Sequence, residues 1–216
     1  SQAAHFRELA AEALGQIGPP ASVAVPALIR ATRDEADAVR RHAVTALGAM
    51  GAAAEIAIEP LAEAMVFDES AAVRDQAAAA LAKIGPPAVP ILRHLLAAED
   101  PGFRRRSAIA LGLMGPGANE AAPDLKPLLD DEQPEIRMAA AEALWSITAD
   151  ATAVLPTAIR ELQSEDRQMR MRAVRLFERM GPKARPAVEE LQRLVRDDRP
   201  HVRQAAAKAL ESIESR

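Results

Sequence analysis

The chain has 216 residues, of which 49% are hydrophobic and only 2% aromatic, and its formal net charge is −4. Because it contains no Cys, disulfides, thiolate catalysis and zinc–thiolate sites are excluded. This net negative charge does not indicate a general nucleic-acid-binding surface. Small aliphatic residues in place of aromatic ones favour closely packed helices over strands.

A pair made of an apolar residue and Arg recurs from one end of the chain to the other. Successive copies are separated by 33, 34, 30, 33, 33 and 33 residues. The pairs are Phe6-Arg7, Val39-Arg40, Val73-Arg74, Phe103-Arg104, Ile136-Arg137, Met169-Arg170 and Val202-Arg203. This regularity predicts one elongated array of repeats, in which each unit packs on its neighbours, without a single central core.

The second copy shows how each repeated helix begins and ends. Asp34 and Asp37 place carboxylates at its N-terminus. Apolar residues then recur at helical spacing from Val39 to Met50, and Gly51 follows where a left-handed residue would end a helix. We call each helix that carries the repeated pair an Arg-type helix. One such helix cannot bury its own apolar face, so neighbouring helices must cover it.

A shorter helix, which we call the Pro-type helix, is predicted between successive Arg-type helices. Its first turn carries a Pro 13 residues before the next apolar-Arg pair, where a missing N–H costs nothing. These prolines are Pro26, Pro60, Pro90, Pro123 and Pro156, and the last unit has Glu189 there. Gly followed by Pro ends four of the Arg-type helices, at Gly18, Gly85, Gly115 and Gly181. Seven Arg-type and six Pro-type segments predict thirteen helices and no strands.

These features resemble HEAT-like repeats, an α-solenoid family that includes the repeats of phycobilisome-lyase-type proteins. The resemblance covers the whole chain and rests on the repeated apolar-Arg pair, the AL-x-x-IG pattern at residues 13–18 and 80–85, and the Pro-type helix. It implies an all-α solenoid of about seven helix pairs in a right-handed superhelical stack, with Arg-type helices on the concave side. We expect one domain over residues 1–216. Its units are 1–18 (a half repeat), 19–51, 52–85, 86–115, 116–148, 149–181 and 182–216.

The repeated Arg is interpreted first as structural. An Asp precedes it by six residues in four units, at Asp34, Asp68, Asp131 and Asp197. This spacing predicts a ladder of Arg–Asp pairs between stacked units. Ala98 and Ser164 stand at that position in two other units. Arg104 and Arg170 are therefore the ladder members that we expect to be most free for another role.

A helical projection of the Arg-type helices separates the buried positions from a second set that faces the groove. In the first three units this second set is mixed and mostly polar, whereas basic and apolar residues alternate in the later ones. Apolar anchors surrounded by charge are typical of peptide recognition. We therefore predict a site for a protein or peptide partner with an acidic segment in units four to six. It comprises Arg105, Arg106, Ile109, Leu113, Met138, Trp145, Met171, Arg172, Arg175 and Arg179.

Two points of this site stay open at the level of sequence. Trp145 is either a surface anchor or a plug between units, because Trp is enriched in both settings. The arginines are either partner ligands or ordinary solvated charges.

Catalytic motifs are absent from the sequence. There is no Gly-rich phosphate loop, GxSxG or HExxH, and the His-Glu dipeptide of iron-binding HEAT-like enzymes does not occur. Four histidines in different units have no expected metal-ligand partner at i+3 or i+4, so we expect them to be solvated: His5, His42, His94 and His201. The sequence favours a non-catalytic protein-binding scaffold without cofactor or metal. The alternatives are nucleic-acid binding by the basic part of the groove, in the style of HEAT-like DNA glycosylases, and a lyase- or chaperone-like role on a protein partner.

The remaining expectations concern the membrane and the ends of the chain. The longest charge-free run, residues 13–29, is interrupted at Gly18-Pro19-Pro20, so we predict neither a membrane span nor a signal peptide. The cytoplasm is slightly favoured, and the oligomeric state is open. No Pro-type helix precedes the first helix, so its apolar face should be under-covered and prone to fraying or self-association, at Phe6, Ala10, Ala13 and Leu14. The last helix should form a polar cap, with Lys208, Glu211, Glu214 and Arg216.

Overall fold

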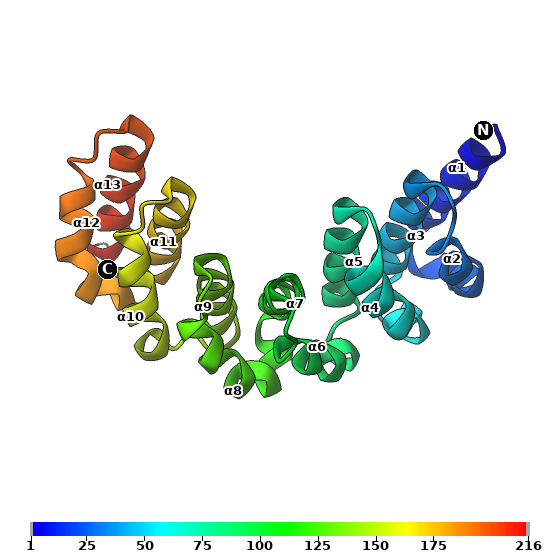
Figure 1. Cartoon of the computed structure of the whole chain (residues 1–216), viewed down its shortest axis with the longest axis horizontal. Helices are drawn as coiled ribbons and strands as arrows, with labels where there is room; N and C mark the ends of the chain where they lie inside the picture. The colour runs from blue at the N-terminus through cyan, green and yellow to red at the C-terminus, as the bar shows by residue number, and fades with distance from the viewer. Residues whose placement is uncertain (1, 215–216) are drawn as a thin grey trace. The chain divides into compact units, whose positions relative to one another are not determined.

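The computed structural model describes residues 2–214, apart from the side chain of His201. Over these residues it has thirteen α-helices, six short 3₁₀ helices and no strand (Figure 1). The fold is thus the predicted all-α solenoid of helix pairs, with the Arg-type and Pro-type helices alternating along the chain. The Arg-type helices are α1 (Gln2–Ile17), α3 (Asp37–Met50), α5 (Ala71–Ile84), α7 (Pro101–Met114), α9 (Pro134–Thr148), α11 (Arg167–Met180) and α13 (Pro200–Glu214).

The Pro-type helices are shorter, and most follow a 3₁₀ segment. They are α2 (Val25–Ala31), α4 (Ile58–Phe67), α6 (Val89–Leu96), α8 (Ala122–Leu125), α10 (Ala151–Leu162) and α12 (Val188–Leu194). The 3₁₀ segments are η1 (Pro19–Ala24), η2 (Gly51–Ala57), η3 (Pro86–Ala88), η4 (Gly115–Ala121), η5 (Lys126–Asp130) and η6 (Gly181–Ala187).

The chain divides into two compact units, Ser1–Ala121 and Ala122–Arg216. In the first unit, α1 packs on α3, α3 on α5 and α5 on α7, while α2, α4 and α6 each pack on the Arg-type helix that follows them. In the second unit, α11 packs against both α9 and α13, and α10 and α12 cover α11 and α13. The single array over the whole chain remains a prediction.

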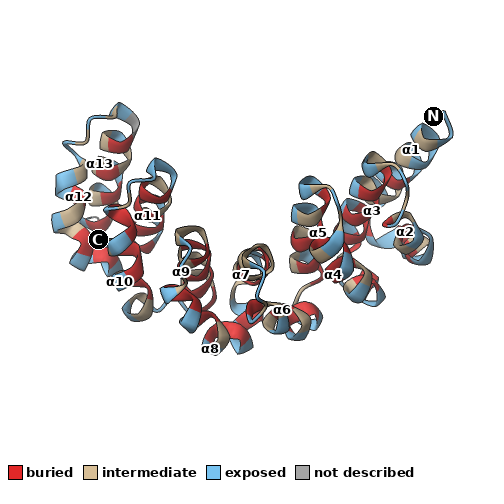
Figure 2. Cartoon of the chain, viewed as in Figure 1, coloured by how far each residue is buried: buried red, intermediate tan, exposed pale blue. Residues whose placement is uncertain are grey.

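Figure 2 marks the buried residues of each unit in red. They are mainly Ala, Leu and other aliphatic residues at helical spacing. In α3 these are Val39, Ala43, Leu47 and Met50, all of them buried. Helices approach so closely that a Cβ added at Gly48 would fall 2.8 Å from the Cα atom of Ala80 on α5. Small residues at such positions therefore set the spacing between stacked Arg-type helices, and aromatic volume is not needed there.

Residues with positive φ end the Arg-type helices, as the sequence predicts. Gly18, Gly51, Gly85, Gly115 and Gly181 have φ between 55° and 91°. At the end of α9 this role passes to Ala149, with φ 51°.

Helix α10 is the exception among the Pro-type helices. The Asp150 carboxylate accepts the backbone N–H of Thr152 at 2.9 Å, so α10 starts directly after Ala149 without a 3₁₀ segment. Pro156 consequently lies inside α10. The prediction that Pro156 occupies the first turn is wrong, because the Asp150 cap begins the helix five residues earlier.

The repeated Arg makes the same pair of hydrogen bonds in six units. Its Nη1 group donates to the backbone carbonyl oxygens five and six residues before it, in the turn that precedes the Arg-type helix. The donors and acceptors are Arg40 to Asp34 and Glu35, Arg74 to Asp68 and Glu69, Arg104 to Ala98 and Glu99, Arg137 to Asp131 and Glu132, Arg170 to Ser164 and Glu165, and Arg203 to Asp197 and Asp198. A carbonyl accepts whatever side chain its residue carries. The expectation that Arg104 and Arg170 are free is therefore wrong.

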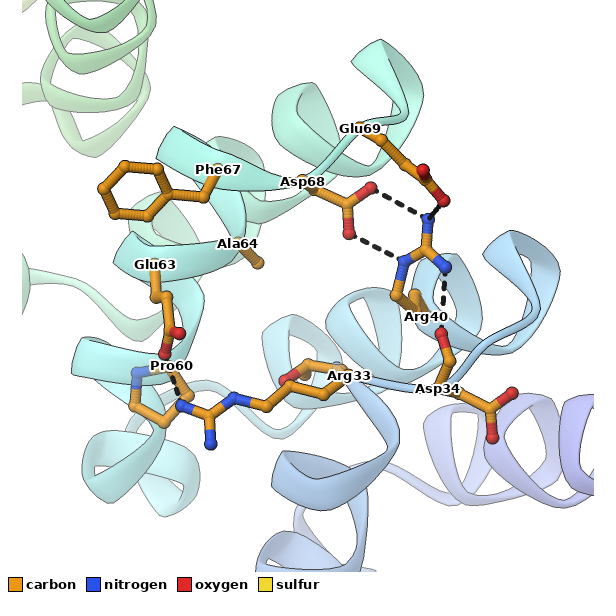
Figure 3. Close-up of a pocket in the computed structure, with 10 residues that line it drawn as sticks. Arg33, Asp34, Arg40, Pro60, Glu63, Ala64, Phe67, Asp68 and Glu69 are labelled. Carbon is orange, nitrogen blue, oxygen red and sulfur yellow. Dashed lines mark hydrogen bonds and ion pairs between the residues drawn. The ribbon is translucent and has the colours of Figure 1, made fainter.

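Several of the repeated arginines also reach carboxylates of the following unit, which confirms the ladder at those positions. Arg7 bonds to Asp34 at 2.6 and 2.8 Å. Arg40 bonds to Asp68 at 2.8 and 3.1 Å and to Glu69 at 3.1 Å (Figure 3). The Asp that precedes an Arg by six residues thus supplies its carbonyl to that Arg and its carboxylate to the Arg of the unit before. The hydrogen bond from Arg7 also lowers the pKa of the Asp34 carboxyl.

The ladder is less regular in the second unit. Arg137 bonds to Glu161 on α10 at 2.6 Å. The Nε atom of Arg170 is 3.9 Å from the Asp197 carboxylate and has no hydrogen-bond partner. These ion pairs therefore differ in partner and in distance, whereas the carbonyl contacts are constant.

The first helix is under-covered, as predicted. Phe6 is 63% exposed, Ala10 and Ala13 are exposed and Leu14 is half-buried. Val39, which occupies the position of Phe6 in the next copy, is buried. Fraying or self-association at this face remains a prediction. In the last helix Lys208, Glu211 and Glu214 are exposed, and Arg216 lies outside the described residues.

One stretch, Asp37–Phe67, has the length and composition of a membrane-spanning helix, although the core helix of a soluble protein passes the same test. It is not one straight helix, because η2 separates α3 from α4 with Gly51 at φ 56° and Ala54 outside the helical region. Leu47 and Leu61 within this stretch are completely buried. The apolar character of the stretch is therefore explained by its place in the core.

Candidate partner-binding surfaces

In the second unit, α11 presents a stripe of basic and apolar side chains. Arg167, Met171 and Arg175 follow one another at intervals of four residues, so they share one face of the helix. With Gln168 and Arg172 they line a surface cavity of about 450 Å³. Arg167 and Arg175 are exposed, and neither has a hydrogen-bond or ion-pair partner among the described residues. We call Arg167, Met171 and Arg175 the α11 surface.

Two other predicted arginines of α11 already have partners within the unit. Arg172 donates to both carboxylate oxygens of Glu142 on α9, at 3.1 and 2.8 Å. Arg179 donates to the hydroxyl oxygen of Ser146 at 2.8 Å. Since the Arg172 charge is neutralised by Glu142, Arg172 attracts an acidic partner less strongly than its position on the helix predicts.

Trp145 is half-buried on α9, and one face of its ring is covered. The ammonium group of Lys183 lies 5.4 Å from the ring centroid and donates to the Ala149 carbonyl at 2.7 Å. This cation–π contact joins α9 to η6. Trp145 thus packs against the connection that follows α11 and keeps part of its surface in solvent.

The prediction that Met138 belongs to the partner site is wrong. Its side chain is completely buried, so it belongs to the core of α9 and cannot form a pocket for a partner. The buried arc of α9 also includes Ala139 and is wider than that of α3. A flexible Met side chain fills irregular space in such a core.

In the first unit, α7 carries the other four predicted site residues. Ile109 is exposed and Leu113 is 64% exposed, one turn further along the same face. Arg105 is half-buried and has no partner among the described residues. Arg106 differs from the prediction, because it is only 8% exposed, with its guanidinium 5.8 Å from the ring centroid of Phe103.

A cavity of about 320 Å³ lies beside the ladder, at a place where no site was predicted from the sequence (Figure 3). Phe67, at the end of α4, is 78% exposed and lies at its edge, and an ion pair between Arg33 and Glu63 borders it. A signal was available, because other copies have residues other than aromatics at the position of Phe67. These are Arg33, Ala97, Asp130, Gln163 and Arg196.

Two histidines are less isolated than predicted. His5 Nδ1 lies 3.6 Å from one oxygen of Glu8, and His42 Nε2 lies 3.5 Å from the other. Glu8 is at i+3 from His5, so the expectation that His5 has no acidic neighbour at this spacing is wrong. His94 is exposed as expected, and the side chain of His201 lies outside the described residues. Among the described side chains, no group of three or more His, Asp or Glu is arranged to hold a metal ion.

Comparison with known proteins places the chain among helical repeats. A family model for HEAT repeats matches residues 1–66, 58–145 and 155–216. A comparison with curated proteins gives no significant match.

Solved structures with a similar fold include three of different kinds. The complex of CpcE and CpcF of phycocyanin lyase from Nostoc sp. PCC7120 has 25% sequence identity and a TM-score of 0.57, with 99% of this chain and 91% of that chain covered. An archaeal HEAT-like repeats protein from Thermococcus onnurineus NA1 has 17% identity and a TM-score of 0.59, with 96% and 92% covered. The karyopherin Kap121p, bound to the extreme C-terminus of the protein phosphatase Cdc14p, has 14% identity and a TM-score of 0.67, with 88% and 25% covered.

Proposed function

Because this chain belongs to the HEAT-repeat family, we propose that it is a non-catalytic scaffold that binds a protein or peptide partner through its Arg-type helices. Stacked repeats present adjacent helices as a continuous surface, and binding then needs no catalytic group. A structurally similar karyopherin is bound to a terminal segment of a phosphatase, which gives a fold-level precedent.

The α11 surface is the observation that carries this proposal. Met171 lies between Arg167 and Arg175, and these guanidiniums have no carboxylate partner among the described residues. Apolar contact beside free positive charge suits a segment with an apolar anchor flanked by Asp or Glu. Bidentate hydrogen bonds from guanidinium to carboxylate would fix the orientation of such a segment.

A double charge reversal, Arg167→Glu with Arg175→Glu, tests the proposal. The variant should keep its fold, because both side chains are exposed and make no internal contact. Its affinity for an Asp- and Glu-rich peptide with Leu anchors should fall by roughly tenfold or more, and the salt dependence of binding should weaken. Isothermal titration at two salt concentrations measures both effects.

The matched control is Arg185→Glu with Arg196→Glu, which reverses two exposed arginines away from α11 and has the same net charge. Equal loss in both double variants would mean that overall charge, and not the α11 surface, attracts the peptide. Unchanged affinity in the α11 variant would remove this surface as the site.

A second candidate is a role within an enzyme complex that acts on a protein. It is favoured by the likeness to a chain in the complex of CpcE and CpcF of phycocyanin lyase, which extends over nearly the whole of this chain. Here too the Arg-type helices would bind the protein substrate. Activity that appears only when this chain is combined with a second subunit would distinguish this candidate from a simple scaffold.

A further inference from the structure

Arg106 is a buried charge whose guanidinium contacts the Phe103 ring but has no hydrogen-bond or ion-pair partner among the described residues. The residue is 8% exposed, and its Nε atom is buried without a hydrogen bond. No carboxylate oxygen among the described residues lies within the 4.0 Å that defines an ion pair with Arg106. Burial, followed by repulsion from Arg74, lowers the pKa of Arg106 from its ordinary value. A buried polar group without a partner costs stability, so its retention calls for an explanation.

The repeat itself does not require a charge at this position. The residue three after the apolar member of the repeated pair is Ala139 in α9 and Ala205 in α13. In α11 it is Arg172, which bonds to Glu142 on the preceding Arg-type helix. The residue on α5 that corresponds to Glu142 is Ala79. The neighbouring helix α5 therefore has no carboxylate at the position of Glu142; its Asp75 attracts Arg106 electrostatically but forms no ion pair with it.

The first turn of α7 is shaped around the guanidinium. A Cβ added at Gly102 would lie 3.0 Å from Nη2 and 3.3 Å from Nη1 of Arg106, so any side chain there would displace it. The nearby Asp100 carboxylate accepts the backbone N–H groups of Gly102 and Phe103, at 2.7 and 3.2 Å. Asp100 thus serves as the helix cap and leaves the guanidinium without an ion pair.

Apolar side chains continue from this position along the same face of α7. At 100° per residue, Gly102, Arg106, Ile109 and Leu113 lie within about 60° of one another. Ile109 and Leu113 are exposed, and they are separated by about 6 Å along the helix axis. The guanidinium, folded back over Gly102, is about 10 Å from Ile109 along that axis. Charge and apolar surface are thus arranged in a line.

We propose that this face of α7 binds an extended segment of a protein partner, whose Asp or Glu carboxylate pairs with Arg106 and whose two apolar side chains contact Ile109 and Leu113. In an extended chain successive side chains point to opposite faces, and alternate ones lie about 6.6 Å apart on one face. An acidic residue two positions before the first apolar one therefore shares its face, and the length of a Glu side chain covers the remaining distance to the guanidinium. The matching sequence is acidic-x-apolar-x-apolar. The proposal rests on the proposed protein-binding function, but it uses a different unit of the chain from the α11 surface.

The probes are two peptides, Glu-Ser-Leu-Ser-Leu and its twin with Gln in place of Glu. Binding is followed by NMR through the Nε–H signal of Arg106. The wild type should bind the Glu peptide roughly tenfold more tightly than the Gln peptide, because one charge-assisted ion pair separates them. Arg106→Met should bind the two equally, with a melting temperature at or above that of the wild type, and peptide backbone signals report its binding. Arg105→Met, the matched control, should keep most of the preference.

A second variant, Ala79→Glu, keeps the test decisive if Arg106→Met does not fold. It places on α5 the carboxylate that Glu142 provides to Arg172, so Arg106 should be neutralised internally and the Glu preference lost. Retention of the preference in either variant would overturn the proposal, as would failure of both peptides to bind the wild type at millimolar concentration. Because the α11 reversals leave α7 intact, failure at one surface is distinguishable from failure at the other.

Discussion

Arg106 on α7 and Arg172 on α11 occupy the same position of the repeat but have opposite surroundings. Arg172 is half-buried and holds both oxygens of Glu142. Arg106 is more deeply buried, and the corresponding residue on the neighbouring helix is Ala79. The repeat thus determines where each guanidinium lies. A single residue on the adjacent helix decides whether its charge is used inside the protein or is available to a partner.

The ladder contains the most deeply buried of these ion pairs. Removing one of its arginines should therefore have the largest effect on the free energy of unfolding. Arg40→Met would leave the Asp68 carboxylate, 5% exposed, without its main partner. The free energy of unfolding should fall by about 3–5 kcal/mol, as for other buried pairs that lose one member. Urea unfolding followed by circular dichroism measures this.

The control for Arg40 is Arg33→Met, which removes an exposed ion pair with Glu63 and should cost at most about 1 kcal/mol. Equal losses in the two variants would show that the ladder contributes no more than a surface pair.

A second unpaired polar group lies beside Arg106, and its removal should stabilise the protein. Ser107 is completely buried and its hydroxyl has no hydrogen-bond partner among the described residues. Ala occupies this position in the other copies, for example Ala77 and Ala140. Ser107→Ala should therefore raise the free energy of unfolding by about 1 kcal/mol. A lower stability in the same urea experiment would mean that the hydroxyl is satisfied in solution.

The partly exposed pair of Arg172 should contribute less than the ladder. Arg172→Met should reduce the free energy of unfolding by about 0.5–1 kcal/mol, since both side chains retain access to water. The double-mutant cycle with Glu142→Gln isolates the pair energy. A coupling near zero would remove the contrast with Arg106.

The smallest effect is expected at the exposed end of the ladder, where Arg7 lowers the pKa of Asp34. A carboxyl whose pKa is lower in the folded than in the unfolded state stabilises the fold above its unfolded pKa, near 3.9. That stability is lost as the pH falls through the folded value. Wild type should lose stability below about pH 4 more steeply than Asp34→Asn. Parallel pH profiles would show that the Arg7 bond is screened by solvent.

Much of the fold follows from the sequence alone, because it is local. The period of the apolar-Arg pair and the positive-φ glycines such as Gly51 depend on residues within one helix or one turn. Helical periodicity and the conformational freedom of Gly act over such distances whatever the rest of the chain does. Thirteen helices could therefore be predicted in order, with Pro156 as the exception where a cap at Asp150 changed the helix start.

The partners of the charged side chains were decided by the tertiary structure. Arg40 meets Asp68 across 28 residues and Arg137 meets Glu161 across 24, so a fixed sequence offset cannot identify both. The same holds for the burial of Met138, which depends on the elements that pack around α9. Contacts between helices exist only once the helices have stacked, and their offset changes with each connection. The sequence therefore determined the order and the apolar period of the helices, while packing decided which side chains are buried, like Met138, and which, like Arg106, remain without an ion-pair partner.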